Sequence, residues 1–126
     1  MKRILIVAML AMMAFVAVAA ADDAKKEEAA AKPTTLTGEV IDLSCYMGHG
    51  ASGMDHAKCA QGCITKGMPV GFLTTDGIMY VILGSNHEPA NKQVADFAGK
   101  KSTITGVVKE DKGLKAIELA SIAEAK

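Results

Sequence analysis

Short runs of apolar and β-branched residues, separated by turn residues, begin at Leu36 and continue to the end of the chain. Partial alternation of apolar and polar positions, rich in valine, isoleucine and threonine, is typical of β-strands. The five strands that this pattern predicts span residues 36–43, 70–75, 78–83, 102–108 and 114–119. We therefore expect one leading strand followed by two hairpins.

The first hairpin has the clearer turn signal. Asp76-Gly77 stands between two apolar runs, and glycine adopts positive φ without a side-chain clash. This dipeptide predicts a tight turn of the primed type. The second hairpin is expected to turn through residues 109–113.

Two short helices are expected between the strands. Ser52 and Asp55 form an S-x-x-D start signal for a helix that runs through Ile64 or Thr65, before the stop at Gly67-x-Pro. A Gly-rich stretch at residues 48–53 is expected to be a loop. The second helix is predicted over residues 89–98, because its apolar residues fall on one face and a glycine follows it.

The element order predicts the fold class. A strand, an inserted helix, a hairpin, a helix and a final hairpin follow the order of the OB-fold. We expect a mainly β domain with two short helices, built as an OB-like, five-stranded, partly open barrel. Residues 44–67 would form a Cys/His-bearing helical insertion between the first and second strands.

The N-terminus has the pattern of a secretory signal peptide. A basic start at Lys2-Arg3 precedes an apolar run over 4–18 and small residues at 19–21. A transmembrane anchor is the weaker interpretation, because the apolar run over 4–18 is shorter than the stretch of about 20 apolar residues that a spanning helix needs. We therefore expect three parts: a signal peptide at 1–21, a flexible charged linker at 22–35 and a single domain at 36–126. The mature protein would be periplasmic or secreted, with no membrane anchor after cleavage.

Composition argues against nucleic acid as a partner. The chain has 14 basic and 14 acidic residues, so it offers no net positive charge to a phosphate backbone. It has no tryptophan, two tyrosines and three phenylalanines, so aromatic platforms for stacked bases are scarce.

The strongest chemical signal is a cluster of cysteine and histidine residues. His56, Cys59 and Cys63 have the i, i+3, i+7 spacing that aligns side chains on one helix face. Cys45 is expected at the end of the first strand, where the Gly-rich loop can fold it back. Three thiolates and an imidazole suit tetrahedral zinc, and soft sulfur also suits cuprous ion. Additional candidate ligands in the same segment are Met47, His49 and Met54.

The sequence is also consistent with other uses of the cysteines. In an oxidising compartment Cys45 could form a structural disulfide with Cys63 or Cys59, which leaves one thiol over. The cysteines could also perform thiol–disulfide chemistry or redox sensing, or only stabilise an OB-like module that binds a protein or glycan. Asp42 fits either a group that orients a histidine ligand or an ordinary turn residue.

Part of the sequence also resembles a known kind of protein. The D-x-x-C motif at 42–45, H-x-x-C-x-x-x-C at 56–63 and G-x-P at 67–69 resemble small exported bacterial OB-like domains, as does the hairpin at 104–122. The resemblance covers about residues 36–122. It implies an OB-like fold and a periplasmic location. It implies no activity and transfers no catalytic residue.

Together these features favour an exported protein that binds zinc or copper and is not an enzyme. We find no nucleophile motif, and a closed site of three sulfurs and a histidine lacks the open position that catalysis needs. A periplasmic partner protein that exchanges the metal is a further expectation.

Overall fold

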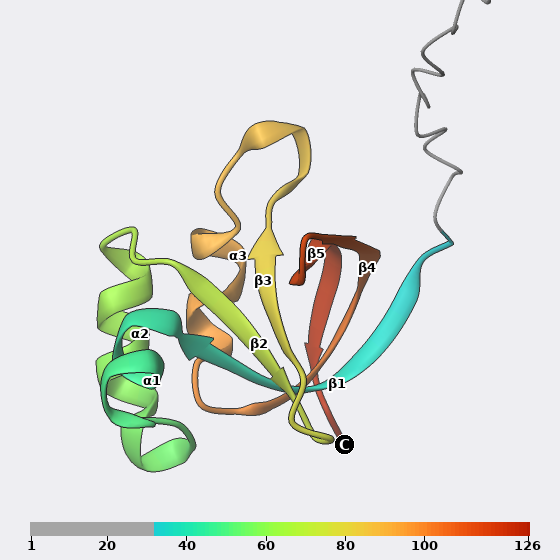
Figure 1. Cartoon of the computed structure of the whole chain (residues 1–126). Helices are drawn as coiled ribbons and strands as arrows, with labels where there is room; N and C mark the ends of the chain where they lie inside the picture. Colours follow the sequence, from blue (N-terminus) through green and yellow to red (C-terminus); the bar gives the residue numbers. More distant parts are fainter. Residues whose placement is uncertain (1–31) are drawn as a thin grey trace, which may run out of the picture.

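Five strands of the computed structural model, which describes residues 32–126, pair in a closed ring (Figure 1). They are β1 (Thr34–Asp42), β2 (Val70–Thr74), β3 (Met79–Leu83), β4 (Lys101–Asp111) and β5 (Leu114–Glu124). The order around the ring is β1-β2-β3-β5-β4, and β4 pairs back onto β1. Only β3 and β5 pair in parallel. The mainly β class expected from the sequence is confirmed.

Short helices connect these strands. They are α1 (Leu43–His49), η1 (Met54–His56), α2 (Ala57–Thr65), η2 (Ser85–His87), α3 (Asn91–Val94) and η3 (Ala95–Phe97), where η marks a 3-10 turn. The first three lie between β1 and β2, and α1 and α2 sit together beside the end of the ring where β1 finishes (Figure 1). The helical insertion between the first two strands is therefore confirmed. No helix within residues 32–126 has the length and apolar character needed to cross a bilayer.

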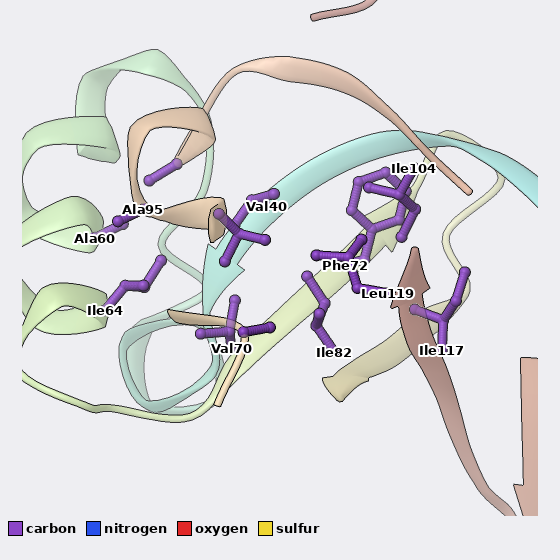
Figure 2. Close-up of a cluster of buried hydrophobic side chains, with 13 residues drawn as sticks. Val40, Ala60, Ile64, Val70, Phe72, Ile82, Ala95, Ile104, Ile117 and Leu119 are labelled. Carbon is purple, nitrogen blue, oxygen red and sulfur yellow. The ribbon is translucent and has the colours of Figure 1, made fainter. Parts of the chain in front are cut away.

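The core fills the ring and continues beneath α2. Phe72, Ile104 and Ile117 are fully buried between the strands. Ile64 is also fully buried, and it extends from α2 toward Val40 of β1 (Figure 2). Burying one such side chain stabilises the fold by about 1.5–3 kcal/mol. The inner face of α2 is thus anchored to the ring, which leaves another face for the cysteines.

The second predicted helix is largely confirmed. Residues 91–97 form α3 and η3, and Ala90 and Val94 are buried in the core as the apolar spacing predicted. Gly99 follows with φ +71°, and its N–H donates to the carbonyl of Val40 at 2.9 Å. This hydrogen bond joins the end of η3 to β1.

The helix α1 was not expected from the sequence. Residues 48–49, expected in a loop, complete this helix instead. Asp42 caps its N-terminus, and Gly50 ends it in the left-handed conformation at φ +66°. An aspartate before the helix and a glycine after it are the residues that such ends favour. Cys45 therefore lies in a helix, not at the end of a strand.

The two hairpins turn differently from expectation. Within 32–126 the positive-φ residues include Gly77 but not Asp76, so the first turn is not a two-residue primed turn. The side chain of Thr74 instead bonds both the carbonyl and the N–H of Ile78 at 2.9 Å and closes a longer loop. The primed pattern occurs in the second hairpin, where Lys112 and Gly113 have φ +48° and +84°.

The ring and its start also differ from expectation. The predicted barrel is partly open, whereas the pairings close. β1 begins two residues early, so Thr34 and Thr35, assigned to the linker, belong to the strand. Pairing with β4 accounts for this, since Thr35 lies opposite Thr105 with their hydroxyl oxygens 3.0 Å apart. The predicted signal peptide at 1–21 and residues 22–31 of the predicted linker lie outside the described residues.

Candidate metal centre

Three thiols from the insertion meet at one place. The sulfur atoms of Cys45, Cys59 and Cys63 all lie within 4.8 Å of one another, and we call this group the three-thiol cluster. All three cysteines are free. A tetrahedral zinc with bonds of about 2.3 Å separates its sulfurs by about 3.8 Å, so small side-chain rotations would bring the cluster to bonding geometry.

Two of the thiols come from α2. Cys59 and Cys63 stand four residues apart and share one face of the helix, as the sequence predicted. The C-terminal end of α2 is held by Asn91 of α3, whose side-chain amide donates to the carbonyl of Ile64 at 2.9 Å and to that of Met68 at 2.8 Å. The N–H of Met68 in turn donates to the carbonyl of Cys63 at 3.1 Å. These contacts fix the backbone that carries Cys63.

The third thiol comes from α1. Asp42 is the N-cap of this helix, and its Oδ1 accepts a hydrogen bond of 3.0 Å from the N–H of Ser44. The N–H of Leu43 donates to the carbonyl of Pro69 at 3.0 Å, which joins the start of α1 to the end of the insertion. Cys45 is thus delivered by a capped helix and not by a flexible loop.

A buried carboxylate adjoins the cluster. Asp42 is only 1% exposed, and its Oδ2 has no partner with hydrogen-bond geometry. Burial by itself raises the pKa of Asp42. Polar contacts with the Cys45 thiol, the N–H groups of Ser44 and Cys45, and the Cys63 thiol act against burial and hold that pKa below its ordinary value of 3.8.

The carboxylate changes the chemistry of two thiols. Contact with Asp42, followed by burial, raises the pKa of Cys45 from 9.0 to about 12. Burial, followed by the charge of Asp42, raises the pKa of Cys63 as well. Without a cation these two groups stay protonated at neutral pH, and a protonated thiol is a poor nucleophile. A metal ion can displace the protons, because its charge stabilises the thiolates.

His56 does not join the three thiols. Within the described part of the chain, the group of mutually close ligand atoms contains only the three cysteines. α2 begins at Ala57, and His56 precedes it in the 3-10 turn with φ −102° and ψ −5°. The shared helix face expected for His56 and Cys59 is therefore not formed. The His56 Nε2 atom is buried without a hydrogen-bond partner.

The additional candidate ligands lie on the surface. Met47 and His49 are exposed on α1, and Met54 is exposed in η1. His49 is not part of the three-thiol cluster. None of these three side chains is held in a buried position from which it would complete a metal site.

Asp42 is the site residue whose position the sequence analysis did not predict. Its signal was present, because an aspartate directly before L-S-C is a helix-capping residue that places a thiol in the first turn. Because α1 was not expected, the position of Asp42 beside Cys45 was not expected either.

Comparison with known proteins found no relative of this chain. No protein-family model matches the chain, and no curated protein or solved structure matches it.

Proposed function

We propose that this protein binds a soft metal ion, zinc or cuprous copper, through Cys45, Cys59 and Cys63, and that it stores, passes on or is stabilised by the metal without catalysing a reaction. The observation that carries the proposal is the approach of three sulfur atoms to within 4.8 Å of one another. Thiolates hold zinc and cuprous ions well and hard oxygen-seeking ions poorly.

The chemistry of Cys45 and Cys63 supports metal binding over thiol–disulfide exchange by these two thiols. An exchange enzyme needs a thiolate of lowered pKa. The pKa values of Cys45 and Cys63 are raised instead, chiefly by Asp42 for the first and by burial for the second. Three converging thiols also exceed the two that a disulfide uses.

Two further parts of the proposal concern fold and compartment. We propose an OB-like barrel, which is supported by the β1-β2-β3-β5-β4 ring and by the connection through α3 between β3 and β4. We propose export to the periplasm, which is supported by the basic start, the apolar run and the small residues at 19–21.

Native mass spectrometry of protein purified anaerobically from the periplasm tests this function. We expect one zinc or copper ion per chain, which is lost when the three thiols are alkylated. Reduced, folded protein that binds neither Zn(II) nor Cu(I) in a titration would overturn the proposal. A native mass lower by two hydrogens, with a Cys45–Cys63 crosslink in the peptide map, would establish a structural disulfide instead.

A further inference from the structure

Three thiols do not complete a zinc site. Protein-bound structural zinc is almost always four-coordinate and tetrahedral, with ligands drawn from cysteine, histidine and carboxylate groups. The three-thiol cluster therefore leaves one position to fill. The sequence assigns it to His56, and the structure offers a different group.

Two side-chain polar atoms within residues 32–126 are buried without a hydrogen-bond partner: Oδ2 of Asp42 and Nε2 of His56. Buried polar groups are normally paired, so each of these atoms needs an explanation. A role as a metal ligand is one such explanation. The two differ in what surrounds them.

Asp42 is in contact with the cluster. Its carboxylate makes polar contacts with the thiols of Cys45 and Cys63 but not with that of Cys59, and it lies outside the group of ligand atoms that are all within 4.8 Å of one another. Binding of one ion by all four groups would therefore require Cys59 and the carboxylate to move closer together. The Oδ1 atom of Asp42 is held at 3.0 Å by the N–H of Ser44, so the carboxyl group has a fixed orientation. The residue is 1% exposed and ends β1, a strand of the ring. Rigid placement of this kind favours a ligand, because little conformational freedom is lost on binding.

Charge favours the same assignment. Three thiolates and a carboxylate in one place carry four negative charges, and a divalent cation offsets this repulsion better than a monovalent one. Carboxylate oxygen is also a harder donor than sulfur and suits zinc better than cuprous ion.

Resting on the proposed function, we propose that Oδ2 of Asp42 is the fourth ligand, so that the protein holds Zn(II) in a site of three cysteines and one aspartate. Cys59 is the exposed ligand of this site, and the carboxylate contacts the other two thiols. In this assignment His56 does not bind the metal.

X-ray absorption spectroscopy of the zinc-loaded wild-type protein tests the ligand set directly. We expect three sulfurs at about 2.3 Å and one oxygen at about 2.0–2.2 Å. The outer-shell scattering of an imidazole ring should be missing. A spectrum with imidazole scattering would overturn the assignment of Asp42 and restore His56.

Two matched variants test the same point by affinity. Asp42→Asn keeps an oxygen that can accept from the N–H of Ser44 but loses the carboxylate. We expect its Zn(II) affinity to fall by about 100-fold or more. This exceeds the usual loss when the group removed only hydrogen-bonds to a metal ligand. Cu(I) affinity should change by less than about threefold, since three sulfurs remain. His56→Gln should leave both affinities unchanged.

The outcomes separate this inference from the proposed function. If Asp42→Asn binds Zn(II) as the wild type does, the aspartate is not a ligand, although the three-thiol site stands. If the wild type binds Cu(I) and no Zn(II), the inference fails and the soft-metal function survives. If the wild type binds neither ion, the function itself fails. Circular dichroism of each metal-free variant establishes folding, and the wild-type spectrum decides the ligand set where a variant does not fold.

Discussion

The carboxylate of Asp42 lies against the thiol of Cys45, three residues further along the chain, and this contact is the main cause of a pKa of about 12 for that thiol. The same carboxyl group caps α1 through its Oδ1 atom. One residue therefore positions the first cysteine and also sets its protonation. We therefore expect the metal-free protein to lose stability at alkaline pH.

The first prediction concerns that sensitivity. The folded-state pKa of Cys45 is raised above its ordinary value of 9.0, so folded protein keeps a proton that unfolded protein loses. The contribution of this thiol to the unfolding free energy is fully present below pH 9.0 and is lost as the pH rises toward about 12. Urea unfolding of reduced, metal-free protein at several pH values in this range should show the decline.

Cys45→Ser is the control, because serine keeps the size and does not ionise in this range. The fall in unfolding free energy between neutral and alkaline pH should be smaller for this variant than for the wild type. Equal falls would show that other groups cause the alkaline loss.

The second prediction concerns metal affinity. Cys59 is the exposed member of the three-thiol cluster, so Cys59→Ser should leave the fold intact and lower metal affinity by more than about 100-fold. His87→Ala is the matched control, because His87 is exposed in η2 and belongs to no such cluster. Competition titration with a chromophoric chelator measures both. Equal affinities in the two variants would contradict the assignment.

The pH dependence of metal binding is the third prediction. Cys45 and Cys63 have raised pKa values, so each must release a proton before it binds a metal. Affinity should therefore fall as pH is lowered, and calorimetry in buffers of different ionisation enthalpy should report released protons. Binding that releases no protons at neutral pH would exclude these thiols as ligands.

The fourth prediction concerns Gly99, which lies where the insertion meets the ring. A Cβ atom on Gly99 would come 2.6 Å from the carbonyl oxygen of Gly53 and 2.7 Å from the Cβ of Ala57, and φ is +71°. Gly99→Ala should lower the unfolding free energy by about 2–4 kcal/mol through clash and backbone strain. Gly113→Ala is the control, since φ is +84° there and nothing lies within 4 Å. This variant should lower the unfolding free energy by only about 1–2 kcal/mol, because it adds backbone strain without a clash. Equal losses in urea unfolding would show that the contact with Ala57 does not matter.

The fifth prediction concerns Asn91, which joins α3 to the end of α2. Asn91→Ala removes its two hydrogen bonds, to the carbonyls of Ile64 and Met68, and each contributes about 0.5–1.5 kcal/mol. Thermal or urea unfolding of metal-free protein should show the combined loss. Asn91→Asp should be at least as destabilising, because a carboxylate cannot donate to these carbonyls. A stable Asn91→Asp variant would indicate that these bonds contribute little.

Local patterns predicted much of this protein. Alternating apolar residues identified the strands, and the four-residue spacing of Cys59 and Cys63 placed both thiols on one helix face. The buried positions of Ala90 and Val94 followed from helical periodicity. Such features depend on residues a few positions apart, whose geometry is set by the backbone itself.

Only the tertiary structure decided which groups lie beside the thiols. Cys45 meets Cys63 because α1 and α2 pack at the same end of the ring, and no local spacing determines that distance. Helical spacing placed His56 with the thiols, but the chain enters α2 through a 3-10 turn that displaces it. Asp42 contacts two of the thiols instead, since the end of β1 is fixed by pairing with β2. Contacts between distant segments depend on how the whole core packs, and a sequence pattern does not record that packing.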